Sequence, residues 1–131
     1  MEDKIFNAWL AGFWEGEGSL TKFKSKNVYR ITLTQCIKDG RGVELCFNKI
    51  KQRFGGNYYK IIPRKKNHSI TLRYHLDQRD DVLNFIKTIY PYCQIRKKQI
   101  EDVLEYFKTH HRGNSNFHSK TKYQHLLILP Y

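Results

Sequence analysis

Apolar residues along this chain recur at two different spacings, and the changes between them mark the boundaries of the predicted elements. Where they recur three and four positions apart, as on one face of a helix, the predicted helices cover residues 6–13, 43–54, 82–89 and 100–107. Where they alternate with polar residues, as on the two faces of a strand, the predicted strands cover residues 20–26, 28–36, 57–62 and 68–76. The order is therefore helix, hairpin, helix, hairpin and two further helices.

This order is typical of an α+β domain in which a four-stranded antiparallel sheet carries its helices on one face. The other face of such a sheet is open to water or to a ligand. We expect one domain over residues 1–112, because a chain of 131 residues supports a single hydrophobic core. The polar segment that follows ends in four apolar residues, so we expect residues 113–131 to pack on this domain or to extend it.

The alternation also predicts which side chains point away from the helices. In strands 28–36 and 68–76, apolar positions such as Leu33 and Tyr74 alternate with polar ones, and only one set can face the core. The polar side chains expected on the open face are Arg30, Thr32, Thr34, Thr71, Arg73 and His75.

Strand 57–62 alternates less cleanly. We expect Tyr58 and Lys60 on the open face, with Arg64 beyond the strand on the same side. This assignment also exposes Ile62, an apolar residue on an otherwise polar face.

The first predicted strand leaves two alternatives open. Alternation from a buried Leu20 would turn Lys22 and Lys24 toward the helices and Phe23 outward. A β-bulge after Leu20 would reverse this and place the lysines on the open face. We favour the second alternative.

The charge of the chain indicates its kind of partner. Lys and Arg number 24 against 12 Asp and Glu, a formal net charge of +12. Such an excess favours a polyanion, most simply nucleic acid, although ribosomal and membrane-surface proteins share it.

Cysteine and histidine spacing argues against a disulfide or zinc framework. The three cysteines, Cys36, Cys46 and Cys93, are odd in number and form no C-x-x-C pair. His110, His111, His118 and His125 fit no metal-site spacing either. No apolar run is long enough for a membrane span and the first residues do not resemble a signal peptide, so we expect an intracellular, soluble protein without a membrane partner.

Small residues form a second stripe on the first helix. Ala8, Gly12 and Gly16 lie four positions apart. Glycine inside a helix costs up to about 1 kcal/mol relative to alanine, so two in one stripe indicate close approach by another element. We interpret the stripe as a contact face for a second helix.

Two carboxylates, Glu15 and Glu17, lie where this helix ends, next to Gly16 and Gly18, which we expect to stop it with positive φ angles. If the partner helix is a copy of this one, two Glu17 side chains meet across a two-fold axis and can bind a pair of Mg²⁺ ions. Paired metal ions support phosphodiester hydrolysis. The alternative is that both acids are merely solvated.

The nonapeptide LAGFWEGEG at residues 10–18, followed by Ser19, resembles the signature of the LAGLIDADG homing endonucleases. Only one copy of the motif is present, so the chain resembles the single-motif branch, whose members work as homodimers. The resemblance covers about residues 1–108. It implies a saddle-shaped sheet that binds a long, near-palindromic DNA duplex, and a double-strand break with short 3′ overhangs.

The resemblance also implies roles for single residues. Glu17 would be catalytic and bind the metal, with the Gly16 carbonyl as a further ligand, and Gln35 would position the attacking water. A cation, Arg96 or Lys98, would stabilise charge developing on phosphate. The simpler readings are a strand-end hydrogen bond for Gln35, and phosphate binding or a solvated helix start for the two cations.

The implied dimer interface and DNA contacts complete this prediction. The interface residues are Ala8, Ala11, Gly12, Glu15 and Gly16. The DNA contacts add the lysines of the second hairpin turn, which would touch phosphates, to the open-face residues and the first-strand lysines: Lys22, Lys24, Arg30, Thr32, Thr34, Tyr58, Lys60, Arg64, Lys65, Lys66, Thr71, Arg73 and His75.

The implied cofactor is Mg²⁺. Mn²⁺ would substitute for it, Ca²⁺ would bind without supporting cleavage, and no nucleotide cofactor is expected. Both acids of the motif are Glu rather than the Asp of the family name, and segment 37–41 is longer than the family pattern. A relative acting as an RNA maturase on intron RNA, or as a DNA-binding regulator, would share these features. A basic ribosomal or RNA-packing protein would leave the small-residue stripe unexplained.

Overall fold

A computed structural model of the chain describes residues 2–23, 28–37, 41–65 and 69–110. The elements follow the predicted order: α1 (Glu2–Glu17), β1 (Gly18–Phe23), β2 (Val28–Cys36), α2 (Arg41–Phe54), β3 (Asn57–Ile61), β4 (Thr71–Leu76), α3 (Arg79–Ile89), the short 3₁₀ helix η1 (Tyr90–Tyr92) and α4 (Lys97–Thr109). The predicted tail, residues 113–131, lies outside the described residues.

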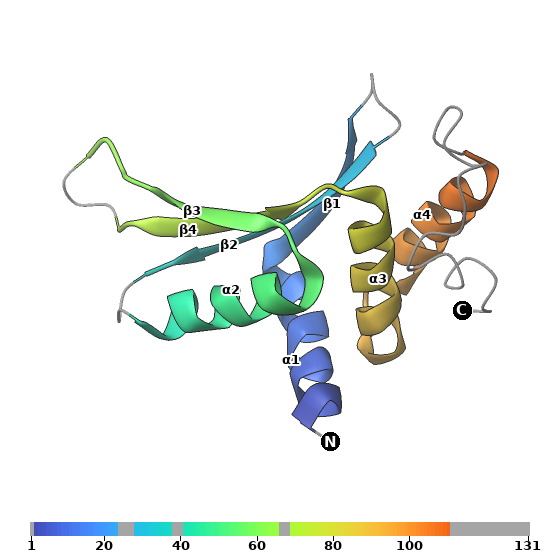
Figure 1. Cartoon of the computed structure of the whole chain (residues 1–131), viewed down its shortest axis with the longest axis horizontal. Coiled ribbons are helices and arrows are strands. Elements are labelled where there is room, and N and C mark those ends of the chain that lie inside the picture. The colour runs from blue at the N-terminus through green and yellow to red at the C-terminus, as the bar shows by residue number, and fades with distance from the viewer. Residues whose placement is uncertain (1, 24–27, 38–40, 66–68, 111–131) are drawn as a thin grey trace.

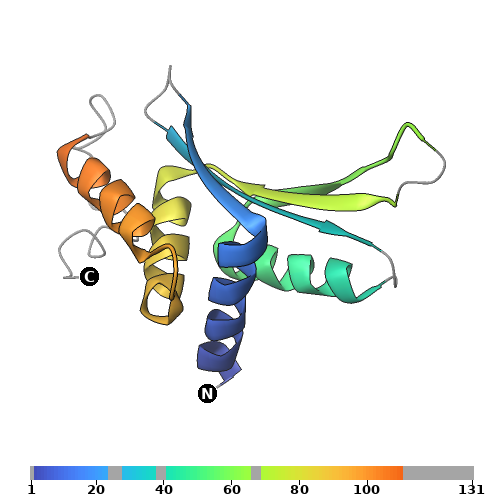
Figure 2. The same ribbon diagram turned by 180° about the vertical axis from the view of Figure 1, so that it is seen from behind.

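The four strands form one antiparallel sheet in the order β1-β2-β4-β3. Each hairpin pairs internally, and β2 and β4 join the two hairpins at the centre. Helices α1, α2 and α3 lie against one face of this sheet, and α4 lies beside α3 (Figure 1). The opposite view shows the same arrangement, with none of the helices of the described residues on the other face (Figure 2). The predicted α+β class, with an open sheet face, is confirmed.

The hydrophobic core lies between the sheet and the helices. Leu33, Leu72 and Tyr74 from the central strands are fully buried against apolar side chains of all four α-helices. Burying a side chain of this size stabilises the fold by about 1.5–3 kcal/mol, so this face of the sheet is fixed toward the helices. None of the helices in the described ranges combines the length and apolar character that crossing a membrane requires.

The turn from α2 to β3 is made by two glycines with positive φ, Gly55 at 88° and Gly56 at 78°. A Cβ on Gly56 would lie 2.5 Å from the His75 carbonyl oxygen. The Tyr74 hydroxyl donates a hydrogen bond to the Gly55 carbonyl at 2.6 Å. Burial raises the pKa of Tyr74, which keeps this donor protonated. The predicted end of α2 at this glycine pair is confirmed.

The end of α1 differs from our expectation. Among the glycines of the described residues, only Gly55 and Gly56 have positive φ angles, so neither Gly16 nor Gly18 stops the helix in that way. The chain passes from Glu17, the last residue of α1, directly into Gly18, the first of β1. A Cβ on Gly18 would lie 2.4 Å from Cδ1 of Trp14. Close approach, rather than a left-handed backbone, therefore requires glycine at this junction.

Candidate functional site

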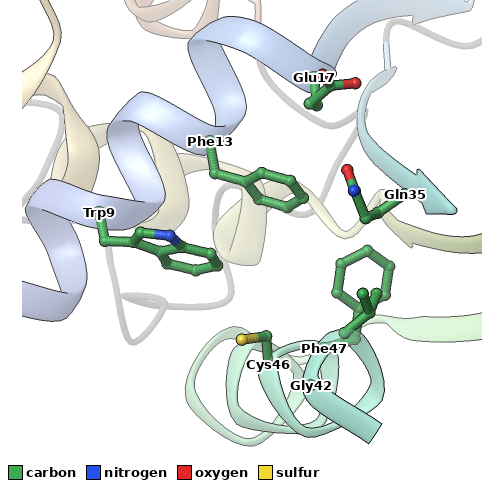
Figure 3. Close-up of a pocket in the computed structure, with 8 residues that line it drawn as sticks. Trp9, Phe13, Glu17, Gln35, Gly42, Cys46 and Phe47 are labelled. Atoms are coloured by element: carbon green, nitrogen blue, oxygen red, sulfur yellow. The ribbon is translucent and has the colours of Figure 1, made fainter. Parts of the chain in front are cut away.

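A cleft of about 470 Å³ lies between α1, α2 and the end of β2. Glu17 and Gln35 lie at one end of it, and the Gln35 amide points toward the end of α1 (Figure 3). Gln35 faces the helices because it pairs with the buried Leu72. The remaining lining is mostly apolar and comes from α1 and α2: Trp9, Phe13, Gly42, Val43, Cys46 and Phe47. The fold therefore brings Glu17 and Gln35 together, as predicted.

Oxygen donors define what this end of α1 can bind. The Glu17 side chain is exposed, and the Gly16 carbonyl is among the last four of the helix, which have no intrahelical donor. A carboxylate and a carbonyl suit a hard cation such as Mg²⁺, which usually takes one or two carboxylates and keeps several waters. Within the described part of the chain, no three His, Cys, Asp or Glu side chains gather.

Glu15 is bound by the start of α4. Its carboxylate accepts hydrogen bonds from the backbone N–H groups of Gln94 at 3.0 Å, Ile95 at 2.5 Å and Arg96 at 2.7 Å. Partial burial alone would raise the pKa of Glu15, but these hydrogen bonds and the Arg96 charge outweigh it, so the pKa is lowered. Glu15 therefore supports the end of α1, as expected, but it does so within its own chain.

Arg96 also contacts residues of its own chain. Its guanidinium carbon lies 3.9 Å from the centre of the Trp14 ring system. Its Nη1 donates to the carbonyl oxygens of Trp14 at 3.0 Å and Gly18 at 2.7 Å. A guanidinium held in this way does not fit the expected role of a cation that faces phosphate.

Lys98 has a partner on the helix surface. Its Nζ forms an ion pair with Asp102 at 2.8 Å, one turn further along α4, and its side chain is 82% exposed. Such exposed pairs contribute little to stability. The structure thus shows Lys98 as a solvated helix residue, which was the simpler reading, and a catalytic role for it stays a prediction.

The small-residue stripe of α1 is uncovered. Ala8, Gly12 and Gly16 are exposed, and a Cβ added to either glycine would meet nothing within 4 Å. Ile5 and Trp9 lie on the same side of the helix and are 69% and 42% exposed, which makes this face apolar. We call these five residues the α1 face.

Two residues of the predicted interface lie elsewhere. Ala11 is fully buried in the core of its own chain, so its assignment to the dimer interface is wrong. Glu15 is directed to the start of α4, as described above, and its assignment to the interface is wrong as well. Both residues lie on the side of α1 that turns away from the exposed Ile5 and Trp9, Ala11 toward the core and Glu15 toward the start of α4.

The open face of the sheet carries the side chains predicted on β2 and β4. Thr32 pairs with His75 and Thr34 pairs with Arg73, on the face opposite the buried Leu33. Arg30 and Thr71 share this face, and Arg30 forms an ion pair with Asp77 at 2.8 Å. The predicted facing of the central strands is confirmed.

The predicted facing of β3 is wrong. Tyr58 pairs with the buried Tyr74, and Lys60 pairs with the buried Leu72, so both point to the helix side. Tyr58 packs edge-on against Phe47 at 6.0 Å between ring centroids, and its hydroxyl donates to Asn48 at 2.8 Å. Apolar residues occur at both parities in this strand, and the contact with α2 selects one of them.

The favoured facing of Lys22 is wrong too. β1 pairs continuously with β2 from Gly18 to Phe23, without a bulge, and Lys22 pairs with Tyr29. The Lys22 ammonium lies 4.3 Å from the centre of the Tyr106 ring on α4, on the helix side of the sheet. Lys24 and Lys66 lie outside the described residues, and Arg64 and Lys65 are exposed just beyond β3.

The sequence reasoning missed several open-face residues, mainly on the two edge strands. Tyr59 lies beside Arg73 in the pairing register and contacts the His75 ring at 5.9 Å between centroids. The others, by the same register, are Asn57, Ile61, Ser19 and Thr21. Strict alternation from Leu20 would have found the two on β1, whereas β3 carries no such signal.

Comparison with known proteins identifies the fold. No family model and no curated protein sequence matches the chain. Two solved complexes of the homing endonuclease I-CvuI match it at 18% identity. The complex with the I-CreI target in 2 mM Mg, in which the DNA is not cleaved, has a TM-score of 0.60 and covers 88% of this chain and 73% of that chain.

The second complex holds the target of I-CvuI in 2 mM Ca, with a TM-score of 0.58 over 79% of this chain. In this comparison the chain spans 66% of the I-CvuI chain. At this identity the shared feature is the fold: the chain has the α+β LAGLIDADG fold of these endonucleases.

Proposed function

We propose that this chain is a LAGLIDADG homing endonuclease, a site-specific enzyme that binds a near-palindromic DNA duplex as a homodimer and cuts both strands to leave short 3′ overhangs. One observation carries the proposal. The motif helix ends at an exposed Glu17 beside an uncovered apolar face, and it continues directly into a sheet with an open polar face.

The α1 face supports the homodimer. A two-fold axis places the same patch of both copies together, and glycines at Gly12 and Gly16 let two helix backbones approach closely. Contact would also cover the exposed Ile5 and Trp9 side chains. Because Glu17 follows this face by one residue, pairing brings two Glu17 carboxylates to the centre of the assembly.

The open face supports recognition of duplex DNA. Its side chains form rows across the strands, for example Thr34, Arg73 and Tyr59. Neighbouring rows are two strand residues apart, about 6.6 Å, which corresponds to about two base-pair steps of 3.4 Å. Arginine reads guanine acceptors in the major groove, and hydroxyl groups contact several bases. Two sheets related by the dimer axis would read two similar half-sites.

Glu17 and the Gly16 carbonyl would hold the divalent metal, which we propose is Mg²⁺, with Mn²⁺ as a substitute and Ca²⁺ as a non-catalytic ligand. When bound, such an ion supplies charge neutralisation at the phosphate and a more acidic water. The Gln35 amide, at the same end of the cleft, would orient the water that attacks phosphorus.

Cleavage of a duplex made by joining the genomic sequences that flank the host intron or insertion tests this function. We expect cutting with Mg²⁺, binding without cutting with Ca²⁺, and binding without cutting by Glu17→Gln. Glu105→Gln, a change of an exposed α4 acid, is the matched control and should cut normally. Undiminished cutting by Glu17→Gln would refute the metal assignment.

A catalytically silent relative, acting as an intron RNA maturase or a DNA-binding regulator, is the second candidate. The observation that favours it is that Arg96 and Lys98, the two cations expected near Glu17, are engaged by their own chain. Tight DNA or intron RNA binding with no cutting under any divalent metal would establish this candidate over the first.

A further inference from the structure

We propose that Arg96 is a positioning residue for Glu17: its guanidinium joins the backbone carbonyls of Trp14 and Gly18, on either side of Glu17, and thereby fixes the junction between α1 and β1. The inference rests on the proposed function, because it concerns the residue that would bind metal there. It replaces the expectation that Arg96 acts on phosphate.

The two carbonyls bracket the acid in sequence. Trp14 lies three residues before Glu17 and Gly18 lies one residue after it, and a single nitrogen, Nη1, donates to both oxygens. The Trp14 carbonyl is one of the last four of α1, which lack an intrahelical donor. No loop separates α1 from β1. The two hydrogen bonds from Arg96 therefore connect the last turn of the helix directly to the first residue of the strand.

Arg96 is itself held from several sides. Its cation–π contact with the Trp14 ring is accompanied by a hydrogen bond from Nε to the Gln99 side chain at 2.9 Å. Gln99 in turn donates to the Leu20 carbonyl in β1 at 3.1 Å, and Glu15 accepts the Arg96 backbone N–H. The contacts with Trp14, Glu15 and Leu20 tie the start of α4 to residues within three positions of Glu17, and the bond to Gln99 links two of these contacts.

The packing leaves little room for adjustment. A Cβ on Gly18 would collide with Trp14, so the indole and the first residue of β1 are already in close contact. A shift of the indole would therefore move the backbone that carries Glu17. Misplacing a catalytic group by about 1 Å can cost about 100-fold in rate.

Lysine does not reproduce this arrangement. An ammonium can donate to a carbonyl, but it lacks the planar surface that stacks on an indole and the fork that reaches a third acceptor. Arg96→Lys keeps the charge while loosening the junction, which makes it the informative change.

Arg79 provides a matched control. Its guanidinium carbon lies 4.5 Å from the centre of the Phe107 ring, and Nη2 donates to the Phe107 carbonyl at 2.7 Å. The kind of contact is the same, but it joins α3 to α4 and does not involve α1 or β1. Arg79→Lys therefore measures what losing such a contact does to stability alone.

The first test uses the free protein without metal or DNA. Thermal unfolding followed by circular dichroism should show comparable losses of melting temperature for the two lysine variants. Hydrogen exchange of the segment from Trp14 to Leu20 should become about tenfold faster in Arg96→Lys only, because opening of the junction is local. Unchanged exchange there would overturn the inference.

The second test separates binding from cleavage. We expect Arg96→Lys to slow single-turnover cleavage in Mg²⁺ by about tenfold or more, with DNA binding in Ca²⁺ within about threefold of the unchanged protein. Gln99→Ala should give a smaller change in the same direction, and Arg79→Lys should cut normally. Equal rate losses in the two lysine variants would overturn the inference. If the unchanged protein cuts nothing, the proposed function fails, while the exchange experiment still decides the role of Arg96.

Discussion

The end of α1 and the open face of the sheet use charged residues in opposite ways. At the end of α1, Glu15 and Arg96 are bound to backbone groups of their own chain, and Glu17 alone of the three remains exposed. On the open face, Arg73 and Tyr59 stay exposed beside each other. Under the proposed function, changes at the end of α1 should therefore alter the rate of cleavage, and changes on the open face should alter affinity and sequence preference.

The largest expected effect comes from a change on the α1 face that leaves the chain itself intact. In Gly12→Leu the new side chain starts in open space beside its own chain, because a Cβ there meets nothing within 4 Å. It also favours the helix by up to about 1 kcal/mol. We expect a monomer by analytical ultracentrifugation, loss of cleavage and no loss of melting temperature. Gly12→Ala should show a weaker form of the same effect, and a stable Gly12→Leu dimer would contradict the interface.

Arg73→Ala should change recognition without changing chemistry. Loss of a base-reading arginine costs about 1–3 kcal/mol and relaxes preference at one position in each half-site. Selection from a randomised duplex library measures this directly. Arg30→Ala is the control on the same face, and its effect should be smaller because Arg30 is paired with Asp77. Unaltered preference in Arg73→Ala would remove this residue from base reading.

Glu15→Gln should lower the stability of the folded chain at neutral pH more than at acidic pH. The pKa of Glu15 is lowered from 4.5 in the folded chain, because its carboxylate accepts backbone hydrogen bonds that outweigh the effect of burial. Its stabilising contribution is present above that ordinary pKa and is lost as the pH falls through the folded value. The difference in melting temperature between the unchanged protein and Glu15→Gln should therefore be largest at neutral pH and should shrink as the pH falls below the ordinary pKa of 4.5. A difference independent of pH would contradict the assignment.

The smallest expected effect is a difference in DNA binding between variants of two lysines, Lys65 and Lys22. Lys65→Ala should weaken binding to all sequences by a few-fold and reduce the salt slope by about 1, as expected for one phosphate contact. Lys22→Ala should change neither, because Lys22 lies on the helix side over Tyr106. Equal salt slopes for the two variants would contradict the difference in facing.

The facing of side chains was predicted correctly from the sequence in the strands where burial of one face is the only constraint. In β2 and β4, one face is fully buried, so alternation around Leu33 and Tyr74 determines the other face. In β3, both Tyr58 and Tyr59 could pack on a helix or face outward, and only the neighbouring Phe47 decides between them. Edge strands with apolar residues at both parities therefore need tertiary contacts for their assignment.

The candidate site was predicted in part for a related reason. Glu17 and Gln35 could be identified from the motif and from the end of a strand. The role of Arg96 depends on Trp14 and Gly18, which are 82 and 78 positions away in the sequence. No local pattern records such a contact. The requirement for glycine at Gly18 was likewise recognised as backbone conformation, whereas its cause is the indole beside it.

The direct passage from α1 into β1 has a consequence for how such a chain can acquire new targets. Ser19 and Thr21 lie on the open face within four residues of Glu17, so altering them to suit another sequence also disturbs the acid. Tyr59, Ile61 and Thr71 lie on β3 and β4, which are not continuous with α1. Retargeting, by evolution or by design, should therefore proceed through the second hairpin first, and β1 should be the last strand to change.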